Sequence, residues 1–234
     1  MSFQLEAQAA YVLHTRPYRE TSLLVDLFTL EQGKVSVVVR GARSPRSRMR
    51  AVMQPFTPIQ VGWRGRQELK NLTQAEAVSV PMFLKGDALM CGLYVNELLE
   101  RLLPVQDPHP RLYVYYQYVL NELQSGKDIE LALRTFEQKL LQQLGYEFDV
   151  QHCQAELIYS YEPEQGFIQV SQVTERTKKS CFRGEQLLGI AAEQYDRPEI
   201  RRAAKRLMRL ALEARLGNRP LQSRELFKSY GAKT

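Results

Sequence analysis

The chain has 234 residues, of which 44% are hydrophobic and 25% charged. This composition is typical of a globular protein and excludes wholesale disorder or a collagen-like chain. No apolar run approaches the about 20 residues that a membrane-spanning helix needs, and the first residues lack the basic start and apolar core of a secretory signal. We therefore expect a cytoplasmic protein with no membrane partner. Three widely spaced cysteines, Cys91, Cys153 and Cys181, indicate no disulfide framework.

Charge is distributed unevenly along the chain. The net charge of +6 divides into +5 over residues 1–80 (11 basic, 6 acidic), −6 over 81–194 (10 and 16) and +7 over 195–234 (11 and 4). Residues 40–66 contain no acid and seven arginines: Arg40, Arg43, Arg46, Arg48, Arg50, Arg64 and Arg66. The planar guanidinium suits phosphate oxygens, and each neutralised phosphate releases a counterion. The run predicts a phosphate-binding loop, with a merely solvated loop as the alternative.

The first eighty residues predict a small β-barrel. Short β-rich runs follow one another, with a hairpin signal around Gly33 and a basic loop over residues 41–53 that is too poor in apolar residues to be a strand. The expected strands cover residues 10–14, 22–29, 35–39, 56–63 and 69–80. Five strands with one long loop fit the partly open Greek-key barrel of the oligonucleotide-binding (OB) fold. An SH3-like barrel has a similar strand count and is the alternative.

Such a barrel binds nucleic acid through basic side chains and exposed aromatic rings. Tyr18 and Trp63 are the aromatic residues set among arginines, although a lone tryptophan also suits a core. The candidate DNA-binding residues in this region are Arg16, Arg19, Lys34, Arg40, Arg43, Arg46, Arg48, Arg50, Trp63, Arg64 and Arg66.

The remainder of the chain is predicted to be mainly helical. Apolar residues recur at helical spacing in 87–103, 112–123, 128–144, 184–195 and 198–216. Residues 146–166 read as irregular, and residues 167–170 suit a short strand. We therefore predict an α+β protein with an OB-fold domain at 1–80 and a helical domain at 81–234, with an irregular insertion at about 146–183.

The helix predicted at 198–216 has a basic stripe made of Arg202, Lys205, Arg206 and Arg209. A basic helix face can be merely solvated. Here the local net charge of +7 favours a second anion-binding surface, which would either extend the DNA path or bind an acidic segment of a partner protein.

No catalytic or metal site is indicated. His152 and Cys153 adjoin, but no second cysteine lies within the two to four residues that a zinc-binding pair requires. The three histidines have no evident nucleophile partner, and no Walker-type phosphate loop occurs. We expect no cofactor, no metal and no enzymatic activity.

Several segments resemble the bacterial recombination-mediator family RecO. The first is YRETSLLVDLFTLEQGKVSVVVRGARSPRS (residues 18–47), followed by QPFTP; further matches are LYVNELLERLL (93–103), LRTFEQKLLQQLGY (133–146) and LQSRELF (221–227). The resemblance implies an OB-fold barrel followed by a helical domain. It also implies binding of single- and double-stranded DNA, annealing of complementary strands, and association with the nucleoid during repair. With RecR, such proteins help to load RecA onto DNA coated by single-strand-binding protein.

Two further expectations follow from this resemblance. Many relatives carry a four-cysteine zinc element after the LGY segment, whereas only Cys153 stands there in this chain, which therefore resembles a zinc-free branch. The acidic C-terminal tail of single-strand-binding protein should suit an apolar pocket beside a cation. Arg134, with Leu133 and Phe136, is the candidate for that site, and a solvent-facing arginine is the alternative.

Two other functions remain alternatives at this point. The same barrel and loop would serve an OB-fold RNA-binding module, because nothing in them reads the 2′-hydroxyl. A phosphate enzyme using scattered carboxylates is the other alternative.

Overall fold

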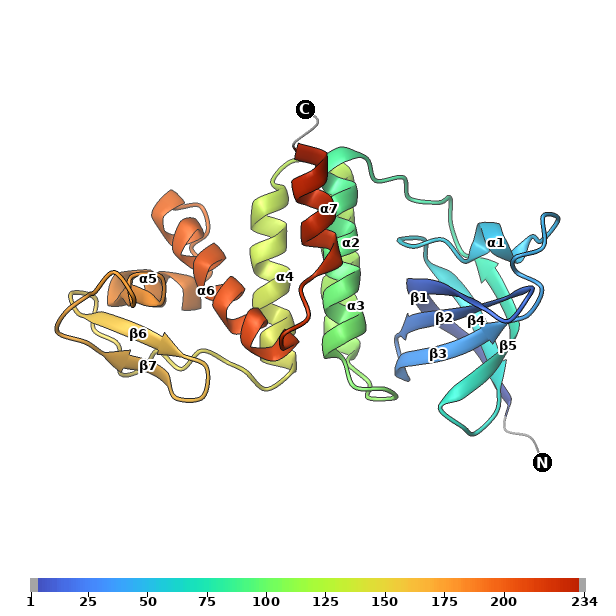
Figure 1. Cartoon of the computed structure of the whole chain (residues 1–234), viewed down its shortest axis with the longest axis horizontal. Helices are drawn as coiled ribbons and strands as arrows, with labels where there is room; N and C mark the ends of the chain where they lie inside the picture. Colours follow the sequence, from blue (N-terminus) through green and yellow to red (C-terminus); the bar gives the residue numbers. More distant parts are fainter. Residues whose placement is uncertain (1–3, 232–234) are drawn as a thin grey trace. The chain divides into compact units, whose positions relative to one another are not determined.

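The computed structural model describes residues 4–231, with side chains described for residues 7–227 (Figure 1). The chain divides into two compact units. The first combines the described parts of Met1–Lys127 and Leu221–Thr234, and the second comprises Asp128–Pro220. None of the described helices combines the length and apolarity needed to cross a membrane.

The first unit begins with a closed five-stranded barrel. Its strands, in spatial order β1-β2-β3-β5-β4, are β1 (Gln4–Tyr18), β2 (Ser22–Thr29), β3 (Gly33–Val39), β5 (Leu69–Ala77) and β4 (Ile59–Arg64). Strand β3 runs parallel to β5, and β4 closes the barrel against β1. This arrangement confirms the predicted OB fold, although the barrel is closed rather than partly open. The long β3–β4 connection also contains a single helical turn, α1 (Met49–Val52), which we did not predict.

Alternation along the strands builds the barrel core. In β3, Val35, Val37 and Val39 are buried and pack with side chains such as Val25 and Leu27 of β2. Period-2 alternation places every second side chain on one face of a strand, so a run such as Val-Ser-Val-Val-Val commits one face to the interior. Burial of these apolar faces is the main stabilising contribution to the barrel.

Three helices complete the first unit: α2 (Gly86–Leu102), α3 (Pro110–Ser125) and α7 (Gln222–Gly231). Helices α2 and α3 confirm the helices predicted at residues 87–103 and 112–123 from the spacing of apolar residues. Pro110 begins α3, where its missing N–H costs nothing, and Gly126 ends it with a left-handed φ of 67°. Helix α7 was not predicted.

A buried amide joins α2 to the barrel. The Asn96 Nδ2 group donates to the carbonyl oxygens of Val12 (3.2 Å) and Leu13 (3.1 Å) in β1, and its Oδ1 accepts from the Tyr116 hydroxyl at 2.7 Å. Burial raises the pKa of the Tyr116 phenol well above its ordinary value. Tyr11 of β1 packs edge-on against Tyr116, with ring centres 5.0 Å apart. Saturated hydrogen bonds inside an aromatic cluster fix the register of helix against strand.

The connection between α2 and α3 lies directly against the β2–β3 turn. A Cβ atom at Gly33, where φ is 64°, would lie 1.9 Å from the carbonyl oxygen of Asp107, so only glycine fits. Gln106 N–H donates to the Lys34 carbonyl at 2.9 Å, and the Lys34 ammonium donates to the Glu100 carbonyl at 2.6 Å.

Helix α7 begins against α2. The Glu97 carboxylate of α2 accepts from the backbone N–H groups of Gln222 (2.8 Å) and Ser223 (2.9 Å) and from the Ser223 hydroxyl (2.6 Å). A carboxylate at a helix N-terminus satisfies otherwise unpaired donors and complements the helix dipole. The N-terminal cap of α7 therefore comes from a residue more than 120 positions away.

The second unit contains three helices and a small sheet: α4 (Ile129–Gln143), β6 (Ile158–Glu162), β7 (Gly166–Gln169), β8 (Cys181–Arg183), α5 (Gly184–Ala191) and α6 (Pro198–Leu216). The helix predicted at 198–216 matches α6, and the predicted strand at 167–170 corresponds to β7. Strand β6 pairs antiparallel with both β7 and β8. The region 146–183, which we expected to be irregular, therefore includes a three-stranded antiparallel sheet.

Candidate nucleic-acid interface

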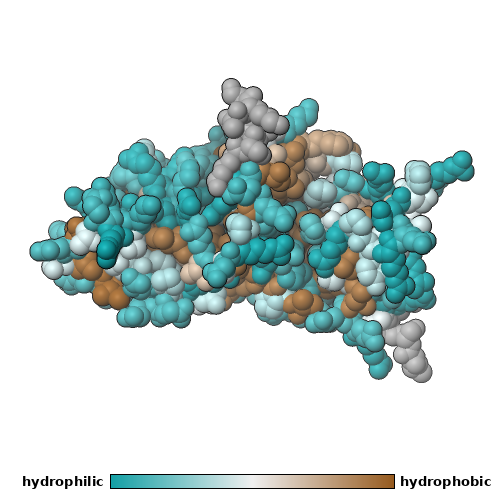
Figure 2. Space-filling model, viewed as in Figure 1, coloured by the Kyte–Doolittle hydropathy of each residue, from teal (hydrophilic) through white to brown (hydrophobic). Residues whose placement is uncertain are grey.

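Nine exposed arginines cover part of the barrel, and we refer to them as the barrel arginine surface. They are Arg16, Arg19, Arg40, Arg43, Arg46, Arg48, Arg50, Arg64 and Arg66. On the face shown in Figure 2, hydrophilic residues predominate around the barrel, and the loop that carries α1 protrudes. In OB folds the β1–β2 and β4–β5 turns flank the strands that bind oligonucleotides. Here Arg19 belongs to the first of these turns, and Arg64 and Arg66 flank Gly65 in the second.

Arg43 attaches the basic loop to the β1–β2 turn. Its guanidinium donates to the carbonyl oxygens of Arg19 (3.0 Å) and Glu20 (3.1 Å), and its backbone N–H donates to the Thr21 carbonyl at 2.9 Å. These bonds bring together arginines that are more than twenty positions apart in the sequence. Arg19 also lies over the Tyr18 ring at 5.2 Å, which places an aromatic face beside the cations.

Asn71 connects the loop to the β4–β5 turn. Arg40 donates to the Asn71 Oδ1 at 3.3 Å, and Asn71 lies opposite Arg64 in the β4–β5 ladder. Through Arg43 and Arg40 the basic loop therefore contacts both the β1–β2 turn and the strand residue that pairs with Arg64.

The positive charge of this surface is mostly uncompensated. Arg16 lies 3.9 Å from the buried Asp26 carboxylate, which the Ser36 hydroxyl also contacts. In contrast, Arg46, Arg48 and Arg50 form no ion pair with any residue that the structure describes. Three neighbouring guanidinium groups without carboxylate partners attract polyanions over about a Debye length.

Two predicted DNA-binding residues lie elsewhere. Trp63 is 2% exposed and belongs to the barrel core, so its ring faces offer no stacking surface to a base. Lys34 is half-buried and donates to Glu100, and burial lowers the pKa of its ammonium while the Glu100 and Asp26 carboxylates oppose that change. We leave both residues out of the barrel arginine surface.

The basic stripe of α6 is largely engaged within the second unit. Lys205 pairs with Glu130 at 3.2 Å, Arg209 pairs with Glu213 at 2.9 Å, and Arg206 lies 4.3 Å over the Phe182 ring. Burial lowers the pKa of the Arg206 guanidinium, which also donates to the Cys181 carbonyl at 2.7 Å. Of the four stripe residues, Arg202 is the exposed one that forms no ion pair with any residue the structure describes. A DNA role for this stripe stays a prediction.

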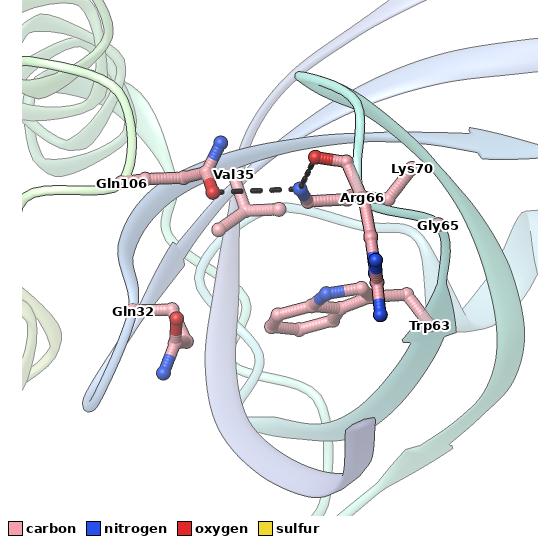
Figure 3. A pocket seen from close by; sticks show the side chains of 7 residues that line it. All are labelled: Gln32, Val35, Trp63, Gly65, Arg66, Lys70 and Gln106. Carbon is pink, nitrogen blue, oxygen red and sulfur yellow. Dashed lines mark hydrogen bonds between the residues drawn. The ribbon is translucent and has the colours of Figure 1, made fainter. Parts of the chain in front are cut away.

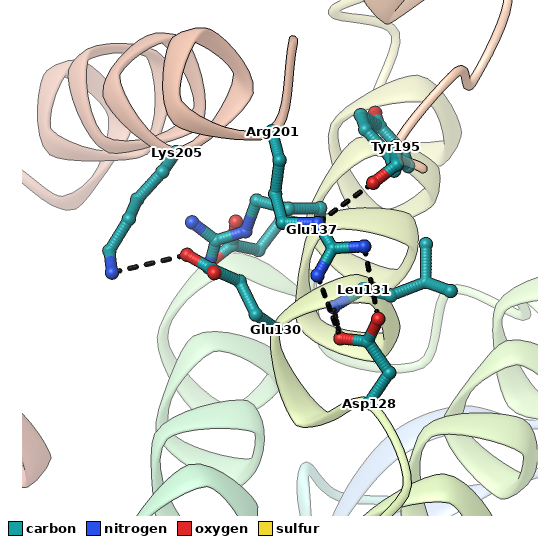
Figure 4. Close-up of polar contacts among 8 residues, drawn as sticks. Asp128, Glu130, Leu131, Glu137, Tyr195, Arg201 and Lys205 are labelled. Carbon is teal, nitrogen blue, oxygen red and sulfur yellow. Dashed lines mark hydrogen bonds and ion pairs between the residues drawn. The ribbon is translucent and has the colours of Figure 1, made fainter. Parts of the chain in front are cut away.

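Figure 4 shows how α6 is attached to the start of α4. Arg201 donates to the Tyr195 carbonyl at 2.8 Å and bridges to Asp128 at 3.0 Å, while Asp128 caps α4 by accepting from the Leu131 N–H at 2.9 Å. Basic side chains on α6 therefore have partners inside the second unit and do not by themselves indicate a bound anion.

The predicted tail-binding residues do not form an open pocket. Arg134 is 6% exposed and pairs at 2.9 Å with Glu137, which is 2% exposed. Phe136 is fully buried, and Leu133 is partly exposed. A guanidinium buried to this extent reaches the carboxylate of a partner protein only if the side chains that cover it move. Its role as a tail-binding residue stays a prediction.

Two polar residues that the sequence did not identify line the β4–β5 end of the barrel. Lys70 is 5% exposed, and Gln106 from the α2–α3 connection contacts it. Lys70 carries no local signal that separates it from a solvated strand lysine, because its burial depends on the distant α2–α3 connection. Within the described residues no three potential metal ligands cluster, and the three cysteines are buried and form no disulfide.

Comparison with known proteins identifies the family. Two family models together span most of the chain: "Recombination protein O N terminal" matches residues 1–81 and "Recombination protein O C terminal" matches residues 84–225. The DNA repair protein RecO of Pseudomonas aeruginosa PAO1 is 46% identical over 233 residues, covering 97% of this chain and 96% of the relative. The protein of the same name from Haemophilus influenzae Rd is 45% identical over 231 residues, with 96% of each chain covered. The chain therefore belongs to the RecO family.

Proposed function

We propose that this chain is a DNA-binding recombination mediator that acts in DNA repair without making or breaking covalent bonds. Its relatives are named DNA repair proteins, which supports the general role. In detail, we propose that it binds single- and double-stranded DNA and anneals complementary strands. With RecR, it would help RecA to load onto DNA coated by single-strand-binding protein.

One observation carries this proposal: the barrel arginine surface joins two turns of an OB fold and has few carboxylates within it. Annealing must bring together two strands that repel each other through their phosphates. Guanidinium groups lower that repulsion by displacing counterions, and no catalytic group is needed.

The protein partners have less geometric support. RecR and RecA enter the proposal through family membership alone. For the acidic tail of single-strand-binding protein, binding at Leu133, Arg134 and Phe136 would require the buried Arg134 to become accessible.

A strand-annealing assay tests the proposal. Two complementary oligonucleotides, one with a donor and one with an acceptor fluorophore, are coated with single-strand-binding protein and mixed with the full chain. We expect annealing to accelerate, the strands to keep their length in Mg²⁺ or Mn²⁺, and matched RNA to compete less well than DNA. Failure to accelerate annealing, or shortening of the strands, would refute the proposal. Tighter binding of the RNA would favour an RNA-binding module instead.

A further inference from the structure

A small pocket opens at the end of the barrel where the β2–β3 and β4–β5 turns meet the α2–α3 connection (Figure 3). Its volume is about 200 Å³, and its lining includes Gln32, Val35, Trp63, Arg66, Lys70 and Gln106, all in the first unit. Val35 and Trp63 belong to the barrel core. The buried side chains of Val35 and Trp63 therefore form part of the pocket wall.

Lys70 places a buried positive charge at this pocket. Its ammonium donates to the Gln67 carbonyl at 2.7 Å, and it lies 3.4 Å from both the Arg66 carbonyl and the Gln106 Oε1. All three acceptors are neutral, and no described carboxylate pairs with Lys70. Two of the contacts are longer than the usual range of about 2.7–3.2 Å, so a charged acceptor can replace them. A buried ammonium without a counterion favours binding of an anion.

A second cation at the pocket points to the same kind of ligand. The exposed Arg66 contributes this cation, and none of the residues that line the pocket is acidic. Figure 3 shows the Trp63 indole along one side of the pocket. The pocket therefore combines an apolar wall with two positive charges and no negative one.

We propose that this pocket binds the terminal phosphate monoester of a DNA strand, an inference that rests on the proposed function. A terminal monoester carries a charge of about −1.5 to −2 and three acceptor oxygens. A terminal monoester therefore matches the two cations, Lys70 and Arg66, better than an internal diester does. Drug-sized ligands occupy pockets of about 300–1,000 Å³. This smaller pocket suits a phosphate group rather than a whole nucleotide.

The position of the pocket favours DNA over other anions. Arg64 and Arg66 flank the same turn, so the pocket adjoins the barrel arginine surface. A strand bound along that surface can place its terminal group over Lys70 without leaving the barrel. An acidic peptide would lack the repeated charges that use the rest of the surface.

Anisotropy titrations of the full chain test the inference. The ligands are one oligothymidylate with a 5′-phosphate, a 3′-phosphate or hydroxyls at both ends, labelled internally. We expect one phosphorylated end to raise affinity about tenfold over the hydroxyl form, because charge-assisted hydrogen bonds are the strong ones. Arg66→Ala and Lys70→Met should remove the preference. Arg66 is exposed, so its replacement remains informative if Lys70→Met fails to fold. Arg46→Ala, outside the pocket, should weaken all three ligands and keep the ratio.

Each alternative result has a distinct meaning. Equal binding of all three oligonucleotides would overturn the pocket inference while leaving the proposed function intact, whereas no binding at all would overturn both. A preference that survives in both pocket variants would place end recognition elsewhere. Loss of the preference at micromolar thymidine monophosphate, or at micromolar acidic peptide, would reassign the pocket to that ligand and refute the inference.

Discussion

The basic loop offers the sharpest quantitative test of DNA binding. We consider the triple replacement of Arg46, Arg48 and Arg50 by alanine. These side chains are exposed and form no ion pair within the described chain, so their removal should change folding stability by no more than about 0.5 kcal/mol. Arg43 is retained because it holds the loop against the β1–β2 turn.

The expected effect follows from counterion release. For a single strand, the slope of log affinity against log salt is about −0.7 per neutralised phosphate, so three lost contacts should flatten it by about 2. When the salt concentration rises from 50 to 200 mM, the ratio of the parent protein's affinity to that of the triple variant should therefore fall about twentyfold. Fluorescence anisotropy with an oligothymidylate at four or five salt concentrations measures the slope directly.

A charge-matched variant separates local contacts from net charge. Replacing Arg176, Lys178 and Lys179 with alanine also removes three positive charges, but from an exposed turn of the second unit. Its slope should stay close to that of the parent protein. Equal flattening by both triple variants, or none by the loop variant, would show that the loop does not contact phosphates.

Three other predictions concern the framework of the two units. Asn96→Ala leaves two backbone carbonyls and the Tyr116 hydroxyl without partners and should lower the free energy of unfolding in urea by about 2–4 kcal/mol. Tyr116→Phe should lower it by about 1 kcal/mol. Small losses of equal size in both variants would contradict the assigned role of Asn96. Burial alone would raise the pKa of Glu97, but its hydrogen bonds to Ser223 and Gln222 and the charge of Arg101 lower it, so the stabilisation by Glu97 is complete above the unfolded pKa of about 4.3 and is lost as the pH falls through the lower folded pKa. Glu97→Gln should therefore lower the free energy of unfolding by about 1 kcal/mol at pH 7 and by less at pH 3. A cost that does not depend on pH would argue against a charged cap. Arg134→Ala removes the ion pair of the buried Glu137 carboxylate with Arg134 and should cost about 3–5 kcal/mol in thermal or urea denaturation. Arg134→Leu with Glu137→Leu should recover most of that loss. A loss below 1 kcal/mol for Arg134→Ala would show that the pair is not buried in solution.

Local patterns predicted the elements whose signals are contained within them. Alternating valines gave β3, and the helical repeat between Pro198 and Gly217 gave α6 with its observed bounds. Strands β6 and β8 have only five and three residues, and they form because they pair with each other across more than twenty positions. Helix α7 has its cap supplied by Glu97, which no window around residue 222 contains.

The residues of the candidate site also divide into those that the local sequence predicts and those that depend on distant parts of the chain. The absence of acids between residues 40 and 66 was sufficient to predict an exposed cationic loop. Burial of Trp63 and Arg134, in contrast, depends on which faces of the barrel and of α4 are covered, and that information is not local. Lys70 illustrates the reverse case, because a strand lysine that reads as solvated becomes enclosed when the Gln106 segment crosses it.

The cap that Glu97 provides also has a consequence for the order of biosynthesis. Residues 221–231 complete the unit that begins with the barrel, but the ribosome makes them only after the 93 residues of Asp128–Pro220. At about 5–20 residues per second, translation of that stretch takes about 5–20 s. During this interval the nascent chain presents α2 with the Glu97 carboxylate paired with Arg101 but not yet with α7, and with the surface beneath α7 open to solvent.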